Sequence, residues 1–227
     1  MFKILIPFIL IYQISLSQNV EVNKLLMDGD KAFLTNDYQS SKEKYRNATV
    51  LDSLNKKAWY NLAASELNLG ENEIACEHLY KSYELENQDA SALIKQYCGE
   101  IKYCPKMFLN DVDEQASFIT DNQKLPLMIN NNLNPVYLQL LKKELRKSKI
   151  LLRNAKGRTF LILNINKSGL FEGDVKRVET VDESEKEKVK AEVLNILKTL
   201  VVYNPAKYKG KAVETWPKFG FTINFEY

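Results

Sequence analysis

The last nine residues of the chain alternate between large apolar side chains and smaller or polar ones. The large side chains occupy every second position of the segment FGFTINFEY: Phe219, Phe221, Ile223, Phe225 and Tyr227. Successive side chains of a β-strand point to opposite faces, so this pattern predicts a strand with one buried face. It constrains the fold, because a half-buried strand needs both a neighbouring strand and a covering layer.

The neighbouring strands are predicted just upstream. The apolar run Thr159–Asn166 predicts a first strand, the turn Asn166–Gly169 closes a hairpin, and Phe171–Thr180 returns as a second strand. Asp182 begins a helix, in which Val189, Val193 and Leu197 share one face. If the sheet is antiparallel throughout, the last strand lies beside the first, in the order 2-1-3, and forms an open edge.

This C-terminal block resembles the C-terminal domain of TonB-like proteins. The resemblance covers about residues 134–227 and starts with an amphipathic helix from Pro135. It depends on the N-x-x-G turn of the hairpin, on the strand and helix order, and on a motif before the last strand, in which Tyr203 stands where the family commonly has Trp. The motif residues are Tyr203, Pro205, Ala206, Gly210 and Val213.

The resemblance implies a three-stranded antiparallel sheet with helices on one face. It also implies a partner, because TonB-like domains engage receptor peptides beside the last strand, in the strand-addition mode. The expected partner-binding residues of this strand are Phe219, Phe221, Thr222, Ile223, Asn224 and Phe225. Pairing of two copies of the chain, as a homodimer through the same edge, is the alternative.

Residues 20–104 contain an internal repeat. Sliding the sequence by 34 residues overlays Tyr45 on Leu79 and Ala48 on Ser82, and this period is typical of tetratricopeptide helical hairpins. Such arrays present side chains of their first helices to a peptide, here including Phe33 and Tyr60. The alternatives are a helical-hairpin bundle of another kind, and an array that acts only as a spacer or docking surface.

The amino terminus predicts export. Lys3 is followed by a short uncharged apolar segment, and Ser15 and Ser17 precede a candidate cleavage site, so residues 1–17 are interpreted as a cleaved bacterial signal peptide. We therefore expect a periplasmic or secreted protein with no integral membrane segment after cleavage.

Three cysteines would then lie in an oxidising compartment. Cys76 is expected near the start of one helix and Cys98 near the end of the next. Adjacent helices run antiparallel, so a Cys76–Cys98 disulfide is predicted; Cys98 with Cys104 is the competing pair. A single histidine, His78, is too few partners for a zinc site, and no metal is expected.

Charge is distributed unevenly along the chain. Residues 134–227 hold nineteen Lys and Arg against eleven Asp and Glu, a net charge of +8, so residues 1–133 carry −5. A basic half favours nucleic acid or an anionic surface, but no Arg-rich helix or interleaved aromatic stripe accompanies it. Nucleic acid is therefore not expected as a partner, and a solvated charged face is the simpler interpretation.

No catalytic pattern is found. The sequence has no glycine-rich phosphate loop and no histidine placed to activate a nucleophile, so we expect a non-enzyme without cofactors. Between the two predicted domains, residues 105–133 are interpreted as a joint, with a helix over Asp111–Ile119 and irregular backbone over Leu125–Leu133. The expected fold class is α+β with two domains, the first all-α.

The sequence thus predicts a secreted cell-envelope module for protein–protein interaction, binding an envelope protein or peptide. A TonB-family energy transducer, acting on an outer-membrane receptor, is the alternative. That role needs an uncleaved membrane anchor and a long proline-rich linker, whereas the chain has six prolines. Carbohydrate or lipid binding between the domains is a third class that the sequence leaves open.

Overall fold

The computed structural model describes the backbone of residues 5–225 and the side chains of residues 18–225. Its contacts divide the chain into two compact units, residues 1–102 and 103–227. The fold is α+β, with helices in the first unit and small sheets in the second, as the sequence predicts. The signal peptide expected over residues 1–17 lies outside the described side chains, as does the end of the last strand at Tyr227.

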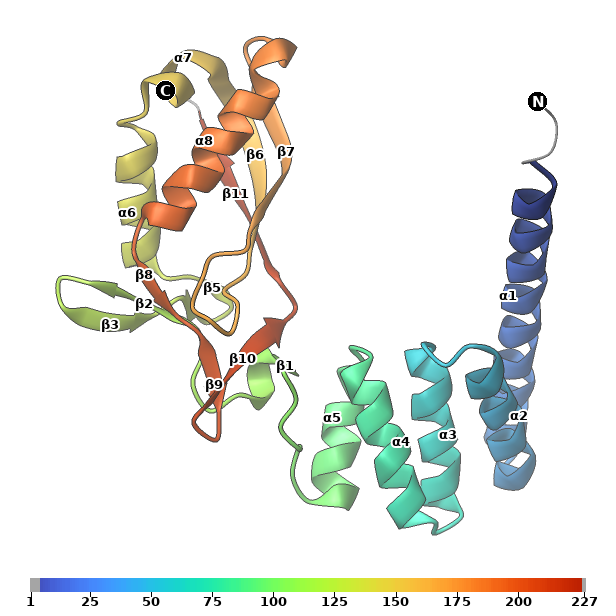
Figure 1. Cartoon of the computed structure of the whole chain (residues 1–227). Helices are drawn as coiled ribbons and strands as arrows, with labels where there is room; N and C mark the ends of the chain where they lie inside the picture. The colour runs from blue at the N-terminus through green and yellow to red at the C-terminus, as the bar shows by residue number, and fades with distance from the viewer. Residues whose placement is uncertain (1–4, 226–227) are drawn as a thin grey trace. The chain divides into compact units, whose positions relative to one another are not determined.

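The first unit is built of helices that pack each on the next in chain order (Figure 1). Within the described residues, no helix of the chain is both long and apolar enough to cross a membrane. The helices of this unit are α1 (Leu5–Leu34), α2 (Tyr38–Leu51), α3 (Lys56–Asn68), α4 (Asn72–Glu84), α5 (Asp89–Leu93) and a π-helical turn, Ile94–Cys98.

The 34-residue spacing recurs in the geometry of this unit. Helices α2 and α4 begin 34 residues apart, each after a residue with positive φ, Asn36 at 60° and Gly70 at 78°. Both turns make the same backbone hydrogen bonds to the preceding helix, for example from Asp37 to Ala32 and from Glu71 to Glu66. The predicted overlay is also reproduced in burial, because Tyr45, Leu79, Ala48 and Ser82 are all buried.

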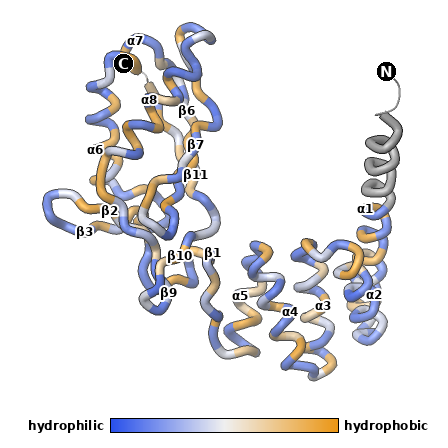
Figure 2. Tube along the Cα trace, viewed as in Figure 1, coloured by the Kyte–Doolittle hydropathy of each residue, from blue (hydrophilic) through white to orange (hydrophobic). Residues whose placement is uncertain are grey.

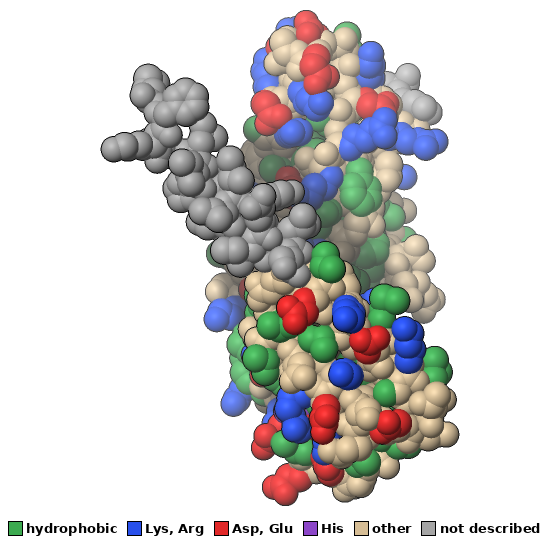
Figure 3. Space-filling model, turned by 90° about the vertical axis from the view of Figure 1, so that its right-hand side faces the viewer, with side chains coloured by type: hydrophobic (Ala, Val, Ile, Leu, Met, Phe, Trp, Pro, Cys, Tyr) green, Lys and Arg blue, Asp and Glu red, His purple; other side chains and the backbone are tan. Residues whose placement is uncertain are grey.

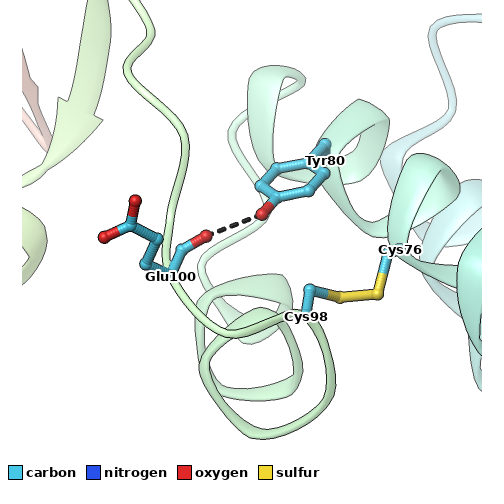
Figure 4. Close-up of a disulfide and its surroundings, with 4 residues drawn as sticks. All are labelled: Cys76, Tyr80, Cys98 and Glu100. Atoms are coloured by element: carbon cyan, nitrogen blue, oxygen red, sulfur yellow. Dashed lines mark hydrogen bonds between the residues drawn. A yellow bond between two sulfur atoms is a disulfide. The ribbon is translucent and has the colours of Figure 1, made fainter.

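The predicted disulfide is confirmed. Cys76 of α4 is bonded to Cys98 at the end of the π-helical turn, with their Cα atoms 5.7 Å apart (Figure 4). The Tyr80 hydroxyl of α4 donates a 2.6 Å hydrogen bond to the carbonyl of Glu100 just beyond. The competing pair is excluded, because Cys98 is bonded to Cys76, whereas Cys104 is a buried thiol. The end of the helical unit is therefore fastened to α4 by one covalent and one polar contact.

The main sheet of the second unit has the order β11-β6-β7 and is antiparallel. It consists of β6 (Ala155–Leu163), β7 (Asp174–Thr180) and β11 (Phe219–Asn224). The last strand lies beside the first of the hairpin, as the sequence predicts. Figure 1 shows α8 (Lys186–Thr199) crossing one face of this sheet.

The segment 105–133, expected as a joint, belongs to the second unit and forms strands. The expected helix over Asp111–Ile119 is wrong, because Ser117–Thr120 is strand β2, which pairs on both sides. One small sheet has the order β3-β2-β8, another has β1-β10-β9 with β1 and β10 parallel, and β4 pairs with β5. Their bounds are β1 Lys106–Phe108, β3 Gln123–Pro126, β4 Met128–Ile129, β5 Asn132–Leu133, β8 Val202–Asn204, β9 Ala206–Tyr208 and β10 Lys211–Trp216.

The core of the second unit lies between its helices and the β11-β6-β7 sheet. Helix α8 buries Val189, Val193 and Leu197, the predicted stripe. Helices α6 (Pro135–Leu145) and α7 (Lys149–Asn154) add further apolar side chains. Figure 2 shows hydrophobic residues recurring along α6 and α8 between hydrophilic ones. Amphipathic helices of this kind cover one sheet face and leave the other to solvent.

Two tyrosines connect this core by hydrogen bonds. The Tyr203 hydroxyl donates to the Leu197 carbonyl at 2.7 Å. Because a hydroxyl has one proton, Tyr137 must be the donor in the 2.8 Å contact between the two hydroxyls. Burial raises the pKa of Tyr203 to about 12 and that of Tyr137 well above its ordinary value. Both hydroxyls therefore stay protonated and hydrogen-bonded at neutral pH.

Substitution of the two tyrosines should have unequal effects. Tyr203→Phe leaves the buried Leu197 carbonyl and the buried Tyr137 hydroxyl without this hydrogen-bond partner. It should lower the free energy of unfolding by about 2 kcal/mol or more. Tyr137→Phe leaves the bond to Leu197 intact and should cost about 1 kcal/mol. Urea unfolding followed by circular dichroism measures both. Equal effects of the two substitutions would contradict the assigned donor order.

Removal of the disulfide should loosen the end of the helical unit. Cys76 and Cys98 are separated by 22 residues in the sequence. For a loop of this size, the entropy of the unfolded chain predicts that removing the bond lowers the free energy of unfolding by about 3 kcal/mol. Hydrogen exchange of α4 and of Ile94–Cys98 should accelerate in the Cys76→Ser/Cys98→Ser variant. Cys104→Ser is the matched control and should leave these amides unchanged. Wild-type exchange rates in the double variant would show that the bond does not hold this end.

Candidate functional site

Strand β11 is an edge of its sheet, with β6 as its neighbour. The Phe225 N–H donates a 2.8 Å hydrogen bond to the Gly157 carbonyl, in register with the pairing of Asn224 with Arg158. Hydrogen bonding alternates along an antiparallel strand, so Ile223 and Phe221 also direct their backbone groups toward β6. The N–H and C=O groups of Gly220, Thr222 and Asn224 therefore point away from the sheet, along its open edge.

The side chains predicted to bind a partner divide into two sets. Ile223 and Phe225 are buried in the core, and Phe219 and Phe221 are half-buried against it, with their rings stacked 6.1 Å apart. The exposed side chains are those of Thr222 and Asn224. The edge thus offers its backbone and small side chains, whereas its aromatic side chains hold the strand in place.

The two helical candidates have different neighbours. Phe33 of α1 makes an edge-on ring contact with Tyr38 of α2, with ring centroids 5.2 Å apart. Tyr60 of α3 is half-buried, and burial together with the negative charge of Asp89 raises the pKa of its hydroxyl. Both side chains are only partly exposed, and each already contacts or faces another helix.

A hollow of about 570 Å³ lies on the face of the main sheet that α8 does not cover. Its residues come from all three strands, because Thr222, Phe160 and Arg177 lie side by side in the register. The Phe160 ring is 39% exposed and forms an apolar part of the wall. The full lining comprises Gly157, Arg158, Phe160, Arg177, Glu179 and Thr222.

The hollow has a cationic side. Arg177 pairs with Glu179 at 3.3 Å, and the other oxygen of that carboxylate accepts a 3.3 Å hydrogen bond from the Arg158 N–H. The Arg158 guanidinium has no ion pair with another described residue. Gly157 has φ of +59°, a left-handed conformation that favours glycine at the local bulge of β6.

Chemically, this arrangement is suited to binding. It combines unpaired backbone donors and acceptors at the edge with small exposed side chains on β11 and an aromatic and cationic hollow beside them. The alternation of side chains along β6 is enough to predict that Arg158 and Phe160 lie on the uncovered face of the sheet. Arg177 and Glu179 of the hollow were not identified as candidates, because their placement depends on the bulged register between β6 and β7.

Comparison with known proteins does not identify the chain: no family model matches it, and no curated protein is similar to it. In the part of the chain that the structure describes, no three His, Cys, Asp or Glu side chains are grouped to hold a metal ion.

The direction of the backbone groups of β11 can be tested with proline. Thr222→Pro removes an outward N–H and should leave the second unit folded. Ile223→Pro removes an inward N–H that bonds to β6, and should lower the free energy of unfolding by about 1 kcal/mol or more beyond the effect of Ile223→Ala. Thermal unfolding measures each variant. If both proline variants stay folded, or if both unfold, the assigned alternation of backbone groups is contradicted.

Proposed function

We propose that the protein is a non-enzymatic interaction protein of the bacterial cell envelope, and that β11 pairs with an extended segment of an envelope protein. The observation that carries this proposal is the row of outward backbone groups at Gly220, Thr222 and Asn224. They lie on the side of β11 that faces away from β6. An edge of this kind is a template for strand addition, in which main-chain hydrogen bonds supply affinity.

The surface beside the edge supports the same proposal. On the uncovered face, β11 carries only glycine, threonine and asparagine, so side chains of an added strand could lie across it toward Phe160. Pockets for alternate side chains give strand addition its specificity. The hollow is placed where such a side chain would enter, with the Phe160 ring as an apolar wall.

The second unit is proposed to be TonB-like. The order β11-β6-β7, with the helices of the core on one face, agrees with the sheet that the resemblance implies. The strands over residues 105–133 are additional to that pattern.

For the first unit, we propose tetratricopeptide-like repeats. The 34-residue spacing of α2 and α4, with equivalent turns at Asn36 and Gly70, supports this assignment. Few repeats and half-buried Phe33 and Tyr60 favour a spacer or docking role over a deep peptide groove.

The cell envelope is proposed as the location. Structural disulfides persist in oxidising compartments, and Cys76–Cys98 is such a bond. The apolar amino terminus agrees with an exported chain.

The proposal is tested by crosslinking and then by affinity. A photoreactive amino acid at Asn224, whose side chain is exposed at the edge, should capture an envelope protein whose crosslinked peptide is extended. The synthetic peptide should bind Thr222→Pro at least about fivefold more weakly than the wild type, because one main-chain hydrogen bond is lost. Thr222→Val is the matched control, since it keeps the N–H, and should bind as the wild type does.

Two outcomes would overturn the proposal. If Thr222→Pro binds the captured peptide as tightly as Thr222→Val does, the edge is not the site. If the crosslink joins two copies of this chain, and sedimentation shows a dimer that Thr222→Pro dissociates, the edge serves self-association instead.

A further inference from the structure

The net positive charge of the chain originates in one short segment. Residues 142–158 contain eight Lys and Arg against one Glu, a net charge of +7. The whole chain carries +3, so all remaining residues together carry −4. The segment comprises the end of α6, all of α7 and the beginning of β6, which lie at the same end of the second unit in Figure 1.

Most of these cations are exposed and have no counter-ion among the described residues. Lys147 pairs with Glu144 at 2.6 Å. Six others, which we call the basic patch, have no ion pair with any described residue. They are Lys142, Lys143, Arg146, Lys149, Arg153 and Lys156, all exposed. Figure 3, seen from the side of β7 rather than of α6, shows Lys and Arg side chains interspersed with Asp and Glu on the upper part of the second unit.

The described glutamates near the basic patch already have partners elsewhere in the second unit. The 3-10 turn Glu183–Glu185 and the first turn of α8 carry three glutamates. Each is paired with the lysine three residues later, at 2.6 Å for Lys186, 3.1 Å for Lys188 and 2.8 Å for Lys190. Glu192 accepts a hydrogen bond from Ser148, and Glu185 also accepts one from Asn154. The basic patch therefore keeps its positive charge, because the glutamates near the start of α8 pair with lysines of α8 instead.

An apolar side chain protrudes within the basic patch. Leu152 of α7 is 49% exposed, between Lys149 and Arg153, whereas its neighbour Leu151 is fully buried. Exposed leucine among unpaired cations is the arrangement by which peripheral proteins bind membranes: the cations contact anionic headgroups and the apolar side chain enters the interface.

We propose that the basic patch docks the second unit on an anionic phospholipid surface, with Leu152 inserted among the headgroups. A lipid surface fits better than nucleic acid for two reasons. The exposed side chain at the centre is aliphatic, whereas single-stranded nucleic acid is bound by stacking on aromatic rings. The disulfide also indicates an oxidising compartment. This contact is separate from the β11 edge, which binds through backbone groups.

The test is vesicle sedimentation with the full chain. Vesicles of phosphatidylcholine alone are compared with vesicles that also contain phosphatidylglycerol, at low and at high sodium chloride. The apolar amino terminus would bind both kinds alike, so the difference between them reports the basic patch. Wild-type protein should prefer the anionic vesicles, and high salt should remove this preference.

Two variants and one matched control sharpen the test. Lys142→Gln/Arg146→Gln/Arg153→Gln should weaken anionic binding by about 100-fold, at about 1 kcal/mol per cation. Leu152→Ser should weaken it about fivefold, because the side chain no longer enters the interface. Lys24→Gln/Lys44→Gln/Lys81→Gln changes the net charge equally, at exposed positions of the first unit, and should bind as the wild type does.

The proposal is overturned by any of three results. The first is equal binding to both kinds of vesicle. The second is an equal loss in the patch variant and the matched control, because net charge alone would then explain binding. The third is wild-type vesicle binding by Leu152→Ser, together with tighter binding to a DNA oligonucleotide than to anionic vesicles, since this would assign the patch to nucleic acid.

Discussion

The second unit depends on the hydrogen bonding of β6 on both of its sides. It pairs with β7 through a local hairpin and with β11, which arrives at the end of the chain. This central strand alternates between buried residues such as Leu161 and Leu163 and more exposed ones such as Phe160. One face must therefore be covered, and α6, α7 and α8 supply the apolar side chains that cover it. The uncovered face and the β11 edge are the surfaces at which partner binding is proposed.

In the first unit, the feature that needs stabilising is the short last helix. A helical hairpin buries its apolar face only against a neighbour, so the last helix of a short array has nothing beyond it. Here α5 has five residues and continues into a π-helical turn. The bond from Cys98 to Cys76 fastens this short end to α4. A covalent link takes the place of the next repeat.

The two binding surfaces proposed for the second unit rely on different physics. Strand addition at β11 uses directional hydrogen bonds from a rigid strand, so it selects an extended segment with little dependence on salt. The basic patch uses unpaired charge and one exposed leucine, and salt screens its attraction. A protein with both could remain close to a membrane while its strand edge binds a protein partner.

The sequence by itself determined the features that arise from local periodicity. Alternation predicts β6 and β11, the stripe of Val189, Val193 and Leu197 predicts the buried face of α8, and helix antiparallelism predicts the disulfide. The TonB-like and tetratricopeptide assignments stay predictions, because no comparison tests them. In α6, Val136 is 40% exposed, whereas the neighbouring Tyr137 is buried together with Leu141 and Leu145.

Only the tertiary structure decided how residues 105–133 pair and in which register the strands of the main sheet lie. The strands between residues 105 and 133 are short and rich in polar residues, and β2 is held by hydrogen bonds to β3 and to β8, about eighty residues away. The outward direction of the Thr222 backbone depends on the register with β6, and the hollow depends on a bulge opposite β7. Register and bulges depend on partners far along the chain, and a local pattern of side chains carries no record of them.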